Sequence, residues 1–360
     1  MQILYTQIDR DAQQQPHFRE HAYRVDANAY FYPASTLKLA GALLALEKLG
    51  RVPGIDRNTL LRIGSAREGQ EAVEVDATSP SGRPNIAHYI RKLFVVSDND
   101  AYNRLYEFVG QEHMNRGLWE KGYCDVRLTH RLSTALSSEE NRHTNPFEFY
   151  RGDEVLYRQP ADYSAQRFSV DRRIEKGRGE LVDGALLHRP KDFSRANFMS
   201  VRVLQDLLRA AVFPNSMPPE RRFALSAEDN RFLLHAMSML PRECAHPRYD
   251  RSTYYDSHVK FFMFGDNKAP MPRHIRLFNK VGLAYGYLID NAYIVDFERG
   301  VEFMLTAVIY ANENGVYNDG QYEYDEISFP FLANLGRVFY EREVQREKEV
   351  IPDLSEFNLH

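Results

Sequence analysis

Alternating hydrophobic and polar residues mark the two ends of the chain, whereas helical periodicity fills most of the sequence between them. Residues 2–9 and 17–25 read as two short strands separated by a polar turn. Apolar residues then recur with helical spacing. The predicted helices cover residues 36–49, 85–95, 100–109, 112–121, 194–212 and 226–240. Three antiparallel strands are predicted at 283–288, 291–298 and 301–311, and a last helix runs from Ile327 to about Val344.

This order of elements predicts a mixed α/β (α+β) fold in one domain. Strands from both ends of the chain can share one antiparallel sheet flanked by helices, which leaves the middle of the chain as an all-helical lobe. The predicted sheet lobe comprises residues 1–34 and 275–345, the helical lobe comprises 35–274, and 346–360 form a tail. Within the helical lobe, residues 147–193 are polar and rich in turn signals, which predicts an inserted hairpin.

Composition excludes several classes of function. The 360 residues are 43% hydrophobic, which is enough for a large core, and the net charge of -4 with mixed signs offers no basic face for a nucleic acid. No apolar run reaches membrane-spanning length, and Met1 leads directly into strand-like sequence without a signal peptide. The 12 histidines and two cysteines show no metal-ligand spacing, so we expect no metal and no cofactor. Nothing in the sequence indicates an oligomeric state.

The helix predicted at 36–49 contains the most informative residue. This helix is apolar on nearly every face, so it should be buried, and Lys38 should lose hydration there. Loss of hydration lowers the pKa of an amine and allows it to accept a proton. Ser35 lies three residues earlier, a spacing that suits activation of a serine nucleophile. In the alternative interpretation, Ser35 is only a helix cap and Lys38 a solvated helix residue.

Two further motifs follow in order. Residues 97–99 (Ser-Asp-Asn) stand at a break between two helical patterns, and residues 280–282 (Lys-Val-Gly) lead into aromatic, strand-like sequence. Each motif is weak alone, because the S-x-x-K spacing recurs at 257–260 and the K-x-G spacing at 48–50. The context at the mouth of a buried helix favours Ser35 over Ser257 as the nucleophile.

The order of the three motifs resembles that of class A beta-lactamases among the penicillin-recognising serine enzymes. The resemblance covers most of the chain and rests on PASTLKLAGALLAL, VVSDNDAYNRL and NKVGLAYGYL. RLTHRLSTALSSEENRHTNP stands in the position of the family's omega loop. The resemblance implies an active site between a sheet lobe and a helical lobe. The long insertion indicates a divergent branch rather than a typical drug-resistance enzyme.

The resemblance implies a role for each matching residue. Ser35 would attack a carbonyl, Lys38 would take its proton, and Ser97 would relay that proton to the leaving group. Asn99 would hold Lys38 and a substrate amide. Lys280 would place a positive charge beside Ser97 and the anionic end of the substrate.

Two backbone features complete the expected site. Gly282 would let the substrate backbone approach the strand closely. The backbone N–H groups of Ser35 and Leu283 would form an oxyanion hole. Asp98 would brace the turn rather than react.

Two departures from the family's pattern concern the substrate's carboxylate and the deacylating water. The third motif has Val281 where the family usually has a hydroxyl that binds the carboxylate, and LAYGYLIDNAY offers no arginine for it. The family's omega-loop glutamate, which activates water, has no counterpart in RLTHRLSTALSS. Glu139 and Glu140 could replace it only if the loop runs differently. We therefore expect intact acylation and slow deacylation.

These observations favour a serine acyl hydrolase that forms an acyl-enzyme at Ser35 with a small-molecule or peptide substrate. The acyl donor could be a beta-lactam, a peptide or an ester. One alternative is a D-alanyl-D-alanine peptidase or transpeptidase, and another is a catalytically silent binding protein on the same scaffold. The resemblance implies a periplasmic or secreted location.

Overall fold

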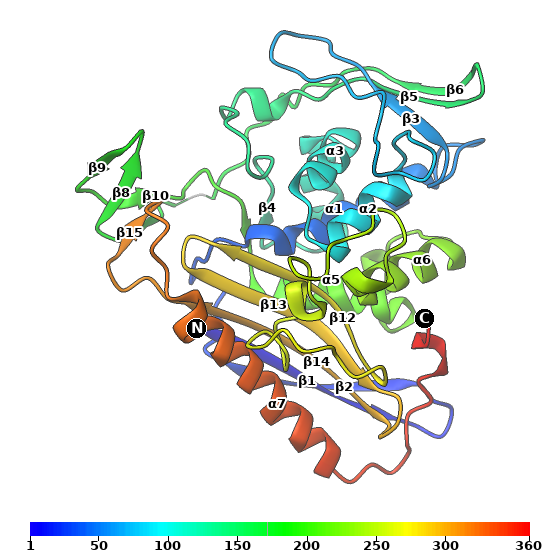
Figure 1. The fold of residues 1–360 in the computed structure, drawn as a ribbon, viewed down its shortest axis with the longest axis vertical. Helices are drawn as coiled ribbons and strands as arrows, with labels where there is room; N and C mark the ends of the chain where they lie inside the picture. Colours follow the sequence, from blue (N-terminus) through cyan, green and yellow to red (C-terminus); the bar gives the residue numbers. More distant parts are fainter. Residues whose placement is uncertain (171) are drawn as a thin grey trace.

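A five-stranded antiparallel sheet joins the two ends of the chain, as the sequence predicts (Figure 1). The computed structural model describes residues 1–170 and 172–360. The strand order is β12-β13-β14-β1-β2, so β1 from the N-terminus pairs with β14 from the C-terminal part. The strands are β1 (Gln2–Arg10), β2 (Pro16–Tyr23), β12 (Ile275–Ala284), β13 (Tyr287–Asp296) and β14 (Val301–Tyr310).

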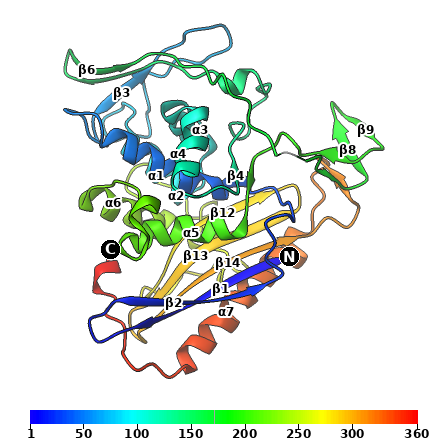
Figure 2. The same ribbon diagram turned by 180° about the vertical axis from the view of Figure 1, so that it is seen from behind.

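Helices cover both faces of this sheet (Figures 1 and 2). On one side lie α1 (Lys38–Leu49), α2 (Ile86–Val95), α3 (Asn99–Val109), α4 (Gln111–Glu120), α5 (Val201–Val212) and α6 (Ala227–Ser238). On the other side lies α7 (Phe329–Gln345). Alternate strand residues supply the two cores: Tyr293 and Met304 pack with the first group of helices, and Phe303 and Leu305 pack with Leu332 of α7. Because both faces are covered, the inner strands β13 and β14 are buried along nearly their whole length, whereas the edge strand β2 is mostly exposed.

Helix α1 runs through the middle of the helical side, where every residue except Lys48 is buried. The predicted burial of this helix is therefore confirmed. A 3₁₀ turn, Ala34–Leu37, leads into it from the sheet. This turn carries Ser35 and contacts β12, so the fold brings the first and third sequence motifs together.

Smaller sheets lie outside the main sheet. The inserted segment begins with the predicted hairpin, β5 (Phe147–Arg151) and β6 (Glu154–Gln159), which extends β3 (Leu60–Ile63). Farther along, β8 (Gly179–Val182) pairs with β9 (Ala185–Leu187) and, in parallel, with β15 (Val316–Tyr317). Two-residue pairs join β7 (Glu175–Lys176) to β10 (Lys191–Asp192) and β4 (Val126–Arg127) to β11 (Phe198–Met199). Residue 171 of the insertion lies outside the described residues.

Two predicted elements are wrong in their bounds. The strand predicted at 283–288 spans a turn, because Tyr285 and Gly286 both have positive φ (56° and 79°) and join β12 to β13 as a two-residue hairpin. The helix predicted at 194–212 begins only at Val201, where the Ser200 side chain accepts a hydrogen bond from Val203 N. The sequence pattern did not show these boundaries, because an aromatic residue stands at the turn and apolar residues precede the cap of α5.

Within the described residues, no helix is long and apolar enough to cross a membrane, and no group of His, Cys, Asp and Glu side chains could hold a metal ion. Both cysteines, Cys124 and Cys244, are free thiols.

Candidate active site

The turn that carries Ser35 is held in a strained conformation. Ala34 has φ of 48°, in the left-handed region that favours glycine, and Ser35 follows it half-buried at the start of the 3₁₀ turn. The N–H and hydroxyl of Thr36 both donate to Pro33 O (3.1 and 2.5 Å) and lock the turn. Such strain persists only where surrounding contacts enforce it, and it clusters at functional sites. Ser35 provides no side-chain cap for α1, which excludes the cap interpretation.

Lys38 is fully buried, with 0% of its surface exposed. Its Nζ donates to Ser97 O (2.5 Å) and Asn99 Oδ1 (2.7 Å), and lies 3.2 Å from Asp98 O and 3.4 Å from Ser97 Oγ. Burial lowers the pKa of Lys38 to about 7, against a smaller opposing effect of the Asp98 charge. Lys38 can therefore lose its proton near neutral pH, and the interpretation of a solvated helix lysine is wrong.

Ser97 joins the second and third motifs. Lys280 Nζ donates to Ser97 Oγ (2.8 Å) and to Val281 O (3.0 Å). Ser97 has φ of 59°, and the cap of α3 is Asp98, whose side chain accepts from Ala101 N (2.8 Å). The Ser97 hydroxyl is therefore free of a capping role and lies between two amines.

The positive charge of Lys38 disfavours the charged form of Lys280. Lys280 is buried, and burial together with the charge of Lys38 lowers its pKa well below the usual lysine value, while Asp290 acts in the opposite direction. Because both amines contact one hydroxyl, their protonation is coupled. A proton can move between Lys38 and Lys280 through Ser97 Oγ without leaving the buried cluster.

Asn99 connects this cluster to the loop that stands in the omega-loop position. Its Nδ2 donates to Ser133 Oγ (2.8 Å), and Ser133 has φ of 52°. One turn along α3, the Asn103 amide holds the backbone N–H and C=O of Leu132 (2.9 Å each). The segment held against the lysine cluster is therefore Leu132–Ser133, and neither residue has a carboxylate.

Glu139 and Glu140 lie farther along the same loop and are both exposed. Glu139 pairs with Arg142 (2.7 Å), and Glu140 accepts a hydrogen bond from Ser137 N (2.7 Å). Glu139 also pairs with Arg167 of the inserted segment (3.5 Å). No described contact joins either glutamate to the Lys38 cluster, so the structure offers no support for either as a substitute base.

Gly282 allows the Ser35 turn to lie against β12. A Cβ at this position would stand 2.8 Å from Pro33 O, 3.1 Å from Thr36 Cγ2 and 3.3 Å from Ala34 Cβ. A side chain at position 282 would therefore push the Ser35 turn away from the strand. Leu283, the next residue, is exposed at the edge of the sheet.

Val281 lies on the opposite face of β12 from Lys280 and Gly282. Its side chain is 4% exposed and belongs to the apolar cluster that contains Phe303 and Leu332. The interpretation that position 281 faces the substrate's carboxylate is therefore wrong for this chain, because strand alternation turns that side chain toward α7.

Comparisons with known proteins find similarity over part of the sequence and in the fold. Residues 12–166 match the model of the beta-lactamase enzyme family. The part of the chain that contains Ser35, Lys38 and Ser97 is therefore similar to this family. Its fold is similar to that of a beta-lactamase from Desulfarculus baarsii (TM-score 0.50, 15% identity, covering 95% of this chain and 91% of that one).

A class A beta-lactamase from Clostridium kluyveri matches with a TM-score of 0.49 and 13% identity, covering 95% of this chain and 92% of that one. A beta-lactamase from Streptomyces albus G matches with a TM-score of 0.48 and 15% identity, covering 95% and 93%. No curated protein matches the sequence.

A third buried lysine, besides Lys38 and Lys280, lies outside the Lys38 cluster. Lys260, in the recurring S-x-x-K motif, is fully buried and donates to Met237 O, Leu277 O and Asn279 Oδ1 (2.6, 3.0 and 2.6 Å). Burial lowers its pKa to about 7 as well. Ser257 instead donates to Asn267 O (2.6 Å), so this motif ties a loop to the edge of β12. A lowered lysine pKa alone does not identify a catalytic base.

Ser133 is the site residue that sequence reasoning missed. Its contact with Asn99 spans 34 residues. Ser133 lies in the segment that stands in the omega-loop position, but no pattern within that segment marks it out. The contact depends on how this loop packs against α3, which is a feature of the tertiary structure.

Proposed function

We propose that this protein is a serine acyl hydrolase that forms an acyl-enzyme at Ser35. The observation that carries the proposal is the buried Lys38 amine, held by residues 97–99 and joined through Ser97 Oγ to Lys280. A structural lysine would not require a hydroxyl shared with a second buried amine beside a strained serine turn.

In the proposed reaction, Ser35 Oγ forms a bond to the substrate carbonyl carbon while its proton passes to Lys38 Nζ. When the tetrahedral intermediate collapses, the bond to the leaving nitrogen or oxygen breaks. The leaving atom then takes a proton from Ser97 Oγ, which is replenished from the lysine pair. Each proton therefore stays within the cluster until the leaving group removes it.

Backbone and amide donors would stabilise the oxyanion and orient the substrate. Because β12 is an edge strand, one row of its N–H groups faces out of the sheet beside the Ser35 turn. We assign the oxyanion hole to the N–H groups of Ser35 and Leu283. Asn99 Nδ2, which donates to Ser133 Oγ in the free protein, would bind the substrate's amide carbonyl. Lys280 would attract the anionic end of the substrate, beside the backbone of Gly282.

Deacylation is the step that the proposed site supports least, because it needs a general base to activate water. Neither residue of the segment against Asn99 has a carboxylate, so the acyl-enzyme lacks the general base expected from the resemblance. The same observation favours one second candidate, a D-alanyl-D-alanine peptidase or transpeptidase, in which an amine would accept the acyl group. The substrate class remains a beta-lactam, a peptide or an ester, and we expect the enzyme to act in the periplasm or outside the cell.

A chromogenic cephalosporin tests this function in one experiment. We expect a burst of about one product per enzyme, followed by turnover far below that of an efficient beta-lactamase. The site contains the serine and the two lysines that acylation needs, but the Leu132–Ser133 segment has no carboxylate to activate water for deacylation. The burst amplitude is measured by stopped-flow absorbance at several enzyme concentrations. Rapid, steady turnover without a burst would contradict slow deacylation. A failure of both this substrate and a fluorophosphonate to acylate the protein would favour the silent binding protein.

The placement of Val281 makes a separate prediction. Val281→Thr should leave acylation unchanged and lower the free energy of unfolding by about 1–3 kcal/mol, because its hydroxyl would be buried against apolar groups. Urea unfolding and burst rates measure the two effects. A rise in acylation of tenfold or more with carboxylated substrates would instead show that position 281 faces the substrate.

A further inference from the structure

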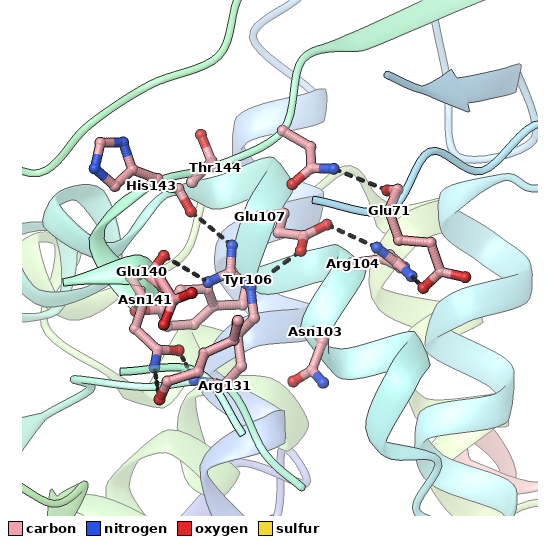
Figure 3. A network of polar contacts seen from close by, with 12 residues as sticks. Glu71, Asn103, Arg104, Tyr106, Glu107, Arg131, Glu140, Asn141, His143 and Thr144 are labelled. Atoms are coloured by element: carbon pink, nitrogen blue, oxygen red, sulfur yellow. Dashed lines mark hydrogen bonds and ion pairs between the residues drawn. The ribbon is translucent and has the colours of Figure 1, made fainter. Parts of the chain in front are cut away.

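A cavity of about 280 Å³ lies between α3 and the two loops that cross it, at residues 67–71 and 131–145. Figure 3 shows the polar side chains around it. Ser35, Lys38, Ser97 and Lys280 are not among its lining residues. Asp100 and Asn103, which follow Asn99 on α3, are among its lining residues. The cavity is therefore distinct from the site proposed above, although it lies close to it.

The floor of the cavity is a buried charged triad. Glu107 accepts from Arg104 Nη1 (3.3 Å) and from Arg131 Nε (3.0 Å), and lies between the two guanidinium groups (Figure 3). All three side chains are more than nine-tenths buried. The triad carries one net positive charge, and Arg104 Nε has no hydrogen-bond partner in the described part of the chain. A buried donor without an acceptor is costly, so the floor is suited to a carboxylate.

The rim of the cavity has the opposite charge. Glu71 and Asp100 each contact Arg104 Nη2 (3.1 Å), but their side chains are 78% and 59% exposed. Asn145 donates to the carbonyl oxygen of Glu71 (2.9 Å) and fixes the backbone of this rim residue. The exposed oxygens of the two carboxylates can accept hydrogen bonds from an ammonium group at the mouth.

We propose that this cavity binds a small zwitterion, with its carboxylate on Arg104 and its ammonium group between Glu71 and Asp100. The volume is slightly below the range typical of drug-sized ligands, which indicates an amino acid or a dipeptide. Both have the same charged ends, so their chemistry at the site is shared. The proposal does not depend on acyl transfer at Ser35.

Isothermal titration of the full chain tests the proposal, with alanine and alanylalanine as probes in the Ser35→Ala background to exclude turnover. We expect at least one probe to bind, and the tighter one indicates the length of the natural ligand. N-acetylalanine lacks the ammonium group and alaninamide lacks the carboxylate, so each should bind at least about tenfold more weakly. Absence of binding by both probes at millimolar concentrations, or equal binding by the analogues, would overturn the proposal.

Three variants place the binding in this cavity. Arg104→Lys retains the charge but removes the Nε–H donor, and Glu71→Gln with Asp100→Asn removes the acidic rim. Each change should weaken binding about tenfold or more. Glu112→Gln, in the exposed Glu112–Arg116 pair of α4, is the matched control and should bind as the parent does. The rim residues are exposed, so the rim variant decides the question if Arg104→Lys fails to fold. Unchanged binding in the rim variant would contradict the assignment.

Discussion

Lys38→Met will leave the protein folded and lower the acylation rate at Ser35 by about two to four orders of magnitude, the usual contribution of a general base. The methionine side chain fills similar buried space but cannot accept the Ser35 proton. The rate is measured as the burst rate with a chromogenic cephalosporin, and circular dichroism checks the fold. In the unmodified protein, acylation should rise with pH through about 7, because the neutral amine is the base and burial lowers its pKa to that value.

Lys48→Met is the matched control for this prediction. Lys48 lies on the same helix, its Nζ donates to Phe108 O (2.5 Å), and burial lowers its pKa to about 8. It has no contact with the Ser97 cluster among the described hydrogen bonds, so acylation should be unchanged. Acylation at the normal rate in Lys38→Met, or a rate that continues to rise above pH 9, would exclude Lys38 as the base.

Ser133→Asp should accelerate deacylation by about a hundredfold or more, since it supplies a general base in the Leu132–Ser133 segment, which has no carboxylate of its own. Ser133 Oγ lies 2.8 Å from Asn99 Nδ2 in an exposed position, so an aspartate there would reach both the cluster and water. Aspartate also tolerates the positive φ of this residue better than most side chains. The decay of a purified acyl-enzyme, followed by intact mass, measures the effect.

The added carboxylate should also raise the pKa of Lys38, because a nearby negative charge favours the ammonium form. The midpoint of the acylation profile should therefore move above its value in the unmodified protein. Ser133→Asn matches the size of aspartate without its charge, and both its deacylation rate and its pH profile should remain those of the parent. If Ser133→Asp deacylates as slowly as Ser133→Asn, the loop does not face the acyl group.

The sequence could predict the parts of this site that depend on local pattern. The apolar run at 36–49 required a buried helix, and a lysine inside that helix had to lose hydration, so the lowered pKa of Lys38 follows from composition and period alone. The sharing of one sheet by both ends of the chain followed from strand signals at each end. These inferences did not depend on how loops that are distant in the sequence pack against one another.

Other features depended on tertiary structure and could not be read from the pattern. The face of Val281 is set by the register of β12, and the expected strand began three residues after Lys280, so the alternation could not be assigned. The Ser133 contact with Asn99 joins a loop to the first residue of α3, 34 positions away in the sequence. Lys260 belongs to the recurring S-x-x-K spacing, which the sequence pattern could not distinguish from chance. Its contacts show that it is a buried residue that links its own loop to β12.

The most direct test of the central claim is the site of covalent labelling. The protein is incubated with a fluorescent penicillin or a fluorophosphonate, and the adduct is measured by intact mass and located by peptide mapping. The account predicts one adduct per chain on Ser35, loss of labelling in folded Ser35→Ala, and normal labelling in Ser257→Ala, which removes the serine of the recurring S-x-x-K motif. Labelling that survives in Ser35→Ala, or that maps to Ser257, would contradict it.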